Sequence, residues 1–405
     1  MGCMTESRDR LFAPARLGPI ELPNRVIKCA TYETRSSAGL VTDELIEWHR
    51  EFAAGGVGMT TLAYCSVASD GRTFRDQIWL RDEALPGLRR FSEAMHHEGA
   101  RAAIQLGHAG WFADPKATGT KPLGPSRMFS PHSQTFSRAM GAEDFERLRD
   151  DFARAARLSV EAGFDALEIH LGHGYLLSQF LSPYNNRRSD EWGDSLEARA
   201  RFPRQIVEIV RKAAGPDVAI YAKLNMDDGF AGGLELHEGI QVARWLEADG
   251  CLDAIQLTGG HTTKSPMYLM RGDSPLGELF GSDPNRIRGL AMRLIASLIT
   301  RNWSFEEAFF LAQASQFRAQ LQIPLMLLGG LNRLETLERA MHEGFEFVAL
   351  GRALIRQPDL INLMKTGTSD DSECTHCNSC VARVGLSPTI CPLRNEDPGA
   401  ATAST

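Results

Sequence analysis

Short apolar runs of four to six residues recur along the chain and alternate with longer segments of helical periodicity. This alternation is typical of βα units, in which helices join parallel strands. Eight such units predict an α/β fold, a closed (β/α)8 TIM barrel, whose chemistry collects on the loops after the carboxyl ends of the strands. The expected strands are residues 26–30, 59–64, 102–106, 166–170, 219–224, 254–258, 325–328 and 347–350.

The helical segments carry start and stop signals. Asp43 is expected to cap a helix that Gly55 and Gly56 end, and Gly163 is expected to stop the helix before the fourth strand. The spacing between the sixth and seventh strands, residues 261–323, is about twice the roughly 30 residues of an ordinary unit. Its pattern, including NRIRGLAMRLIASLITRN, predicts a helical insertion. We expect a structural cap or an oligomer contact, with a substrate lid or a membrane-surface helix as alternatives.

The division that we expect is a barrel over residues 8–368, which includes the insertion, and a cysteine-rich C-terminal segment over residues 369–405. The formal net charge of −7 gives no broad basic face and argues against nucleic acid as a partner. No apolar run approaches a transmembrane span, and the first ten residues lack the apolar core of a signal peptide. We therefore expect a cytoplasmic enzyme with a small-molecule substrate, and a homo-oligomer is left open.

His170 lies at the carboxyl end of the fourth expected strand, and His173 and Tyr175 follow it. Two imidazoles at a strand's carboxyl end can donate to one substrate oxygen, and they would stabilise the charge that grows when a nucleophile adds to a conjugated alkene. Tyr175 can supply a proton. An isolated H-x-x-H also suits a partial metal site, but no third ligand is suggested nearby. The pattern favours a catalytic site.

A second signal follows the last two strands. Gly329 and Gly330 come after the seventh strand, and Gly351 and Arg352 come after the eighth. Glycines let backbone amides approach a phosphate, and an arginine adds a fork of donors at the usual phosphate position of this barrel. The sequence therefore predicts a phosphate site.

The remaining strand ends can hold a flat heteroaromatic ring. The amide of Gln105 can pair with a pyrimidine edge, and Lys223 places a cation where charge would build on a reduced ring. Either residue could instead be a buried structural polar group.

Cys374, Cys377, Cys380 and Cys391 cluster near the end of the chain. In a large cytoplasmic chain, such a cluster suggests metal or redox chemistry before disulfides. Four thiolates can hold an iron–sulfur cluster or zinc, and reduced, unligated cysteines are the alternative.

The stretches LPNRVIKCA, AIQLGHAG, HLGHGYLLSQFLSPYNNRRSDEWG and GG followed by VALGRALIRQPDL occur in an order that resembles the old yellow enzyme family of NAD(P)H:flavin oxidoreductases, from about Leu11 to Pro358. The resemblance implies that FMN lies across the barrel mouth and that NAD(P)H is the co-substrate. It implies the following residues: Ala30, Thr31 and Tyr64 near the ring, Gln105 on its pyrimidine edge, Lys223 near N1 and O2, Gly329, Gly330, Gly351 and Arg352 at the phosphate, and His170, His173 and Tyr175 as catalytic residues, with His170 also against the cofactor.

Some positions depart from the family pattern. Tyr32 stands where many relatives carry Thr or Cys, Tyr64 where a smaller residue is common, and Lys223 where arginine is usual. The cysteine cluster resembles that of the dienoyl-CoA reductase and trimethylamine-type dehydrogenase branch, which carries an iron–sulfur cluster. That branch separates its second and third cysteines by three residues, whereas Cys377 and Cys380 are separated by two.

The resemblance implies an FMN-dependent NAD(P)H oxidoreductase that transfers hydride to the activated C=C bond of an α,β-unsaturated carbonyl compound. The alternatives are a dienoyl-CoA reductase or amine dehydrogenase-like flavoenzyme, a flavin-binding protein without turnover, and a barrel lyase or isomerase that uses the phosphate site for its substrate and Lys223 for a Schiff base.

Overall fold

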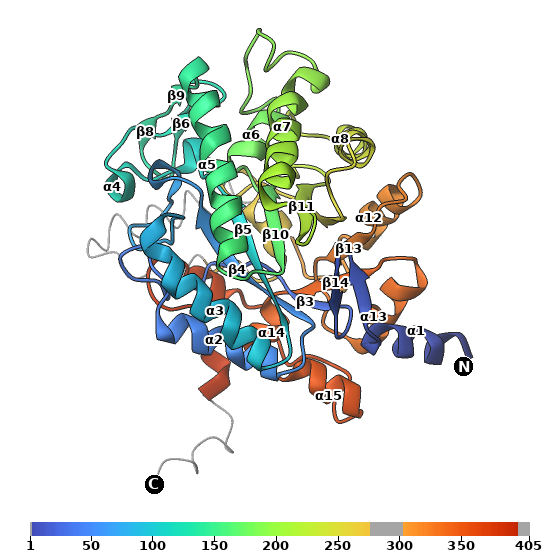
Figure 1. Cartoon of the computed structure of the whole chain (residues 1–405). Coiled ribbons are helices and arrows are strands. Elements are labelled where there is room, and N and C mark those ends of the chain that lie inside the picture. The colour runs from blue at the N-terminus through green and yellow to red at the C-terminus, as the bar shows by residue number, and fades with distance from the viewer. Residues whose placement is uncertain (1, 276–302, 396–405) are drawn as a thin grey trace.

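A closed barrel of eight parallel strands forms the centre of the computed structural model, which describes residues 2–275 and 303–395 (Figure 1). Each strand pairs in parallel with the next, and β14 pairs with β3 to close the barrel. The prediction of a (β/α)8 barrel is confirmed. The strands are β3 (Val26–Lys28), β4 (Met59–Ser66), β5 (Arg101–Gly107), β10 (Ala166–Leu171), β11 (Ala219–Asn225), β12 (Ala254–Thr258), β13 (Leu325–Leu328) and β14 (Phe347–Leu350).

Helices surround the barrel, and short elements lie in its loops (Figure 1). The helices are α1 (Gly2–Phe12), α2 (Asp43–Ala54), α3 (Leu85–His97), α4 (Pro115–Thr118), α5 (Ala142–Glu161), α6 (Leu176–Leu181), α7 (Leu196–Ala214), α8 (Leu236–Ala248), α9 (Pro266–Met270), α12 (Leu311–Arg318), α13 (Leu334–His342), α14 (Arg352–Arg356), α15 (Leu360–Thr366) and α16 (Ser379–Ala382). The small strands after β5 are β6 (Leu123–Gly124), β7 (Phe129–Ser130), β8 (Thr135–Phe136) and β9 (Arg138–Ala139).

The barrel strands are buried on both faces, as expected for a parallel sheet covered by helices. Small side chains such as Ala103, Ala166 and Ala219 share the inner cluster with the larger Tyr221 and Phe347. The antiparallel strands β1 (Ala15–Leu17) and β2 (Ile20–Leu22) add side chains to this cluster. The N-terminal hairpin therefore packs against the barrel interior.

The structure corrects one helix boundary. Thr42, and not Asp43, is the N-cap of α2, because the Thr42 side chain accepts a hydrogen bond of 3.2 Å from the Leu45 amide. Asp43 lies in the first turn, where a carboxylate still favours the positive end of the helix dipole. Gly56 follows the helix end with a φ of +100°, so the predicted stop is confirmed.

The insertion after β12 is described at its two ends, residues 261–275 and 303–323. These ends contain α9 and α12. The helix expected over NRIRGLAMRLIASLITRN, residues 285–302, lies outside the described residues. Among the residues that the structure describes, no helix is long and apolar enough to cross a membrane.

The cysteine-rich segment packs back onto the barrel. The amide of Thr389 donates to the Glu33 carbonyl at 2.9 Å, and the amide of Gly385 donates to Thr34 Oγ1 at 2.8 Å. Since Glu33 and Thr34 follow β3, this segment lies beside the first loop at the carboxyl end of the barrel.

Candidate active site

Polar side chains enter the barrel from three neighbouring strands. Glu168 and His170 are two residues apart on β10, so they point to the same side. The strand register pairs Glu168 with Gln105 on β5 and His170 with Lys223 on β11. Gln105 Nε2 donates to Glu168 Oε1, and Lys223 Nζ lies 2.9 Å from the same oxygen. The structure therefore brings the two predicted ring-binding residues together around a buried carboxylate.

His170, His173 and Tyr175 form one cluster at the end of β10. The ring centroids of His170 and His173 are 5.2 Å apart, and those of His170 and Tyr175 are 4.6 Å apart. His170 Nδ1 is buried and makes no hydrogen bond with any described residue. His173 has a φ of +60°, and its Nε2 lies 2.8 Å from Thr258 Oγ1. One imidazole thus keeps a ring nitrogen available for a ligand, and the other is held by a neighbouring strand.

The surroundings fix the protonation of this cluster. Burial, followed by the charges of His173 and Lys223, lowers the pKa of His170 well below its ordinary value. Burial and the Lys223 charge lower the pKa of His173 to about 3. Burial raises the pKa of Tyr175 to about 12. At neutral pH the site therefore holds two neutral imidazoles and a protonated phenol.

Aromatic rings form one wall beside this cluster. Tyr64 and Tyr175 meet edge to face with centroids 5.0 Å apart, and Ala30 packs against the same small apolar cluster. The Tyr64 hydroxyl donates to the Gly71 carbonyl, so its ring is held against Tyr175. The structure thus places Ala30 and Tyr64 beside Tyr175.

The Thr31 hydroxyl is hydrogen-bonded to both partners of a buried ion pair. Lys28 Nζ donates to Thr31 Oγ1 at 2.6 Å, and Thr31 Oγ1 donates to Glu33 Oε1 at 2.6 Å. Lys28 and Glu33 also form an ion pair, and both side chains are fully buried. Burial by itself would raise the pKa of Glu33, but Lys28 and His49 outweigh it and lower this pKa to about 2. The Thr31 hydroxyl is therefore committed to a charged network that the sequence did not predict.

The predicted phosphate residues lie at the ends of β13 and β14. Gly329 and Gly330 have φ values of +115° and +72°, which L side chains rarely adopt. A Cβ atom on Gly330 would lie 2.6 Å from the Phe309 ring. Arg352 Nη1 donates to the Arg271 carbonyl at 2.9 Å. Glycine is required at this turn both by its conformation and by the close approach of Phe309.

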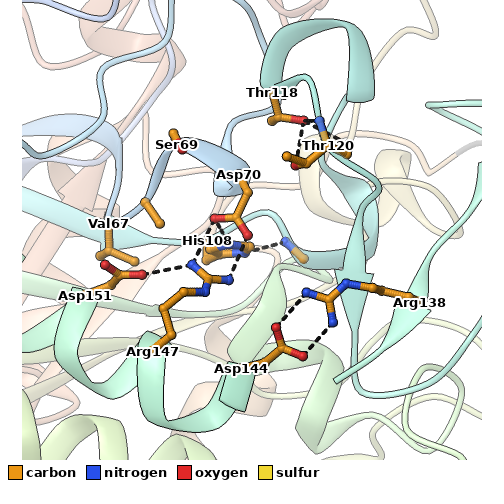
Figure 2. Close-up of polar contacts among 12 residues, drawn as sticks. Val67, Ser69, Asp70, His108, Thr118, Thr120, Arg138, Asp144, Arg147 and Asp151 are labelled. Carbon is orange, nitrogen blue, oxygen red and sulfur yellow. Dashed lines mark hydrogen bonds and ion pairs between the residues drawn. The ribbon is translucent and has the colours of Figure 1, made fainter. Parts of the chain in front are cut away.

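A separate charged network fixes the loops after β4 and β5 (Figure 2). The Gly110 amide donates to His108 Nδ1 at 3.0 Å, so the ring proton lies on Nε2, which is 3.3 Å from Asp70 Oδ1. Arg147 of α5 binds both Asp70 oxygens, at 3.2 and 2.8 Å. The His108 carbonyl in turn accepts from the Leu176 amide at 2.9 Å. This network anchors the backbone that directly follows Tyr175.

The donor set fits FMN. An amide and an ammonium at the end of the barrel suit the pyrimidine edge of a flavin, and a guanidinium beside glycine turns suits its phosphate. Gln105, Lys223 and Arg352 supply these groups from the ends of β5, β11 and β14. Glu168 Oε2 is a further buried atom without a hydrogen bond to a described residue.

The predicted metal ligands lie in the segment that packs on the barrel. Cys380 and Cys391 are buried, and Cys374 and Cys377 are partly buried. Burial raises the pKa of Cys380 to about 12. Within residues 2–275 and 303–395, no group of three or more His, Cys, Asp or Glu side chains is arranged to hold a metal ion. The metal site therefore stays a prediction.

The sequence interpretation missed several residues that support the site. Glu168 could have been found, because it lies two residues before His170 and a strand has a period of two. Thr258 could also have been found, because it is a polar residue at the carboxyl end of β12, where the site of such a barrel lies. Asn378, which accepts a hydrogen bond from Arg352, gives no local signal because the two residues are far apart in sequence.

Comparisons with known proteins find relatives over most of the chain. The model of the NADH:flavin oxidoreductase / NADH oxidase family matches residues 10–257. The 4,4'-dithiodibutanoate disulfide reductase of Rhodococcus erythropolis is 47% identical over 391 residues, which cover 96% of each chain. The NADH oxidase of Thermoanaerobacter brockii is 30% identical, with 91% of this chain and 52% of that enzyme covered. The chain thus spans nearly all of the first relative and about half of the second.

Solved structures show the same architecture. A 2-naphthoyl-CoA reductase superposes with a TM-score of 0.82 at 26% identity, over 96% of this chain and 57% of that chain. The old yellow enzyme homologue of Zymomonas mobilis superposes with a TM-score of 0.71 at 20% identity, over 90% of this chain and 94% of that chain.

Proposed function

Because the chain belongs to the NADH:flavin oxidoreductase / NADH oxidase family, we propose that it uses FMN and NAD(P)H to reduce the C=C bond of α,β-unsaturated carbonyl compounds. The family assignment gives an FMN-type oxidoreductase of the old yellow enzyme family. The acceptor and the roles of individual residues are our proposal. FMN, when bound, supplies hydride chemistry between NAD(P)H and the acceptor.

Gln105, Lys223 and Arg352 would hold the cofactor. Gln105 would pair with the pyrimidine edge, and Lys223 would lie near its N1 and O2 positions, where a fixed cation stabilises negative charge. Gly329, Gly330 and Gly351 would present backbone amides to the phosphate, and Arg352 would add its guanidinium. Ala30, Thr31 and Tyr64 would face the ring.

The histidine pair would bind the acceptor. Neutral imidazoles donate N–H bonds, and His170 and His173 would direct theirs to the carbonyl oxygen, which becomes more negative as hydride adds to the distal carbon. Tyr175 would then give its phenolic proton to the carbon next to the carbonyl. The cluster of these three side chains, with His170 Nδ1 buried and without a described partner, is the observation on which the proposal rests.

The test is the oxidation of NAD(P)H-reduced enzyme by cyclohexenone, followed anaerobically in a stopped-flow instrument. We expect Tyr175→Phe to slow this half-reaction and to leave FMN content unchanged. Replacing His170 and His173 together by Ala should slow it on the order of 100-fold or more, the scale of a lost oxyanion donor. Tyr268→Phe is a matched control, since its hydroxyl donates to Asp227 at 2.8 Å outside this cluster. Unchanged rates in the histidine double variant would refute the assigned roles.

A second acceptor class is favoured by the relative that is 47% identical over nearly its whole length, which is named for reducing 4,4'-dithiodibutanoate disulfide. In that reaction one NAD(P)H and one proton would convert a disulfide into two thiols, and Tyr175 would protonate the leaving sulfur. The same stopped-flow assay with this disulfide in place of cyclohexenone separates the two classes. An enone-silent enzyme that consumes one NAD(P)H per two thiols released would establish disulfide reduction.

Cys374, Cys377, Cys380 and Cys391 would bind an iron–sulfur cluster or zinc, as the sequence pattern predicts. Iron, zinc and acid-labile sulfide measured on the purified protein test this proposal. Less than about 0.1 equivalent of each in protein prepared without oxygen would contradict it.

A further inference from the structure

Three segments that are distant in sequence meet at Arg352. They are the start of the insertion at Arg271 and Asp273, the loop after β14, and the cysteine-rich segment at Asn378. Asn378 Oδ1 accepts a hydrogen bond from Arg352 Nη1. Its Nδ2 donates to the Asp273 carbonyl at 2.9 Å and to the Arg271 carbonyl at 3.4 Å. The Asn378 side chain thus joins all three segments.

Asn378 is built into this position. The residue is 2% exposed, and its φ of +60° lies in the left-handed region, which asparagine tolerates better than most residues. The segment around it is also anchored, because the His376 carbonyl accepts from the Asp273 amide at 3.1 Å. The His376 ring stacks on Phe305 with centroids 3.4 Å apart. The cysteine-rich segment is therefore held against both ends of the described insertion.

These contacts determine the orientation of the Arg352 guanidinium. A guanidinium has five N–H donors in one plane, and fixing one nitrogen with two acceptors fixes that plane. Asn378 and the Arg271 carbonyl both accept from Nη1, so Nη2 and Nε are not used by this pair. A planar fork held in this way is suited to two parallel hydrogen bonds with phosphate oxygens.

We propose that Asn378 is a positioning residue for the cofactor, which orients Arg352 toward the FMN phosphate and makes the cysteine-rich segment part of the cofactor site. This inference rests on the proposed role of Arg352 in phosphate binding. Asn378 directly follows Cys377 in the sequence. A change in the conformation of the cysteine cluster would therefore move the Asn378 side chain and, through it, the Arg352 guanidinium at the phosphate.

The experiment compares FMN with riboflavin, which has the same ring but no phosphate. Dissociation constants are measured by flavin fluorescence on the full-length wild type and on Asn378→Gly, Arg352→Ala and Asn24→Gly. Glycine keeps the positive φ of Asn378 and removes only its side chain. Asn24→Gly is the matched control, because Asn24 is a buried asparagine with two hydrogen bonds, to Gly56 and Val26, at the opposite end of β3. Circular dichroism confirms that each variant is folded.

We expect Asn378→Gly to weaken FMN binding about tenfold and to leave riboflavin binding unchanged, as a lost charge-assisted hydrogen bond predicts. Equal weakening of both flavins, or of neither, would overturn the positioning role. If Arg352→Ala selectively weakens FMN while Asn378→Gly does not, the phosphate site stands and the role of Asn378 is wrong. If Arg352→Ala changes the dissociation constants of FMN and riboflavin by the same factor, Arg352 does not bind the phosphate, and the inference fails as well.

Discussion

Replacing Glu168 should strongly disturb the group that it forms with Gln105 and Lys223 inside the barrel. Its side chain is fully buried between the amide of Gln105 and the ammonium of Lys223, which is itself only 2% exposed. Glu168→Gln keeps the shape of the side chain and removes its charge. Lys223 would then remain in the barrel without its counter-ion.

The expected cost follows from this burial. Removing one partner of a buried ion pair destabilises a protein by about 3–5 kcal/mol, because an uncompensated charge remains inside. The glutamine oxygen can still accept one hydrogen bond, so we expect the lower end of this range, about 3 kcal/mol. Adding Lys223→Met removes the stranded charge, and the double variant should therefore be more stable than Glu168→Gln alone.

The assay is urea denaturation followed by tryptophan fluorescence, at the same free FMN concentration for the wild type, both single variants and the double variant. Glu191→Gln is the control, because the ion pair of Glu191 with Arg201 is exposed and such pairs contribute at most about 1 kcal/mol. A loss below about 1 kcal/mol for Glu168→Gln, or additive effects in the double variant, would refute the role of Glu168 as a buried counter-ion.

Three further predictions concern pH and the phosphate turn. Since the pKa of His173 is about 3 and that of Tyr175 about 12, neither group titrates between pH 5 and 9. The rate of acceptor reduction at saturating acceptor should therefore not change with pH in this range. A pH-dependent change of this rate with a midpoint between pH 5 and 9 that disappears in Tyr175→Phe would contradict the assignment. The pKa of Glu33 is lowered from 4.5 to about 2 in the folded protein, so its stabilising contribution is complete above about pH 4.5 and is lost as the pH falls toward 2. The denaturation midpoint of Glu33→Gln should therefore depend less on pH in this range than that of the wild type. Equal pH dependence of the two proteins would argue against an ionised Glu33. Gly330→Ala should lower the free energy of unfolding by about 1–2 kcal/mol because of the φ of +72°, and by a further amount because of the Phe309 contact. It should also weaken FMN binding. An unchanged melting temperature would show that the turn adjusts to alanine without strain.

Local sequence patterns were sufficient for the barrel. Parallel strands buried on both faces read as apolar runs, and the helices between them carry caps and glycine stops, so each unit is visible within about 30 residues. Short-range patterns also pointed to His170, His173 and Tyr175, because these residues lie at the end of one strand or just after it, and strand ends of this fold meet at one face. Asp43 shows the limit of such signals, since two adjacent polar residues can each cap a helix and only the backbone geometry selects Thr42.

The tertiary structure decided which distant groups share a proton or a charge. The strand register pairs Glu168 with Gln105 of β5 and pairs Lys223 of β11 with His170, so the Lys223 ammonium reaches Glu168 from one position further along the strands. Register is a property of three strands together. Asn378 reaches Arg352 only because the cysteine-rich segment folds back onto the barrel mouth. The sequence alone determined the architecture, through short-range periodicity, and the candidate groups at its mouth, through residue types at strand ends and a family resemblance. Burial and long-range packing, which no local pattern encodes, determined the protonation and orientation of those groups.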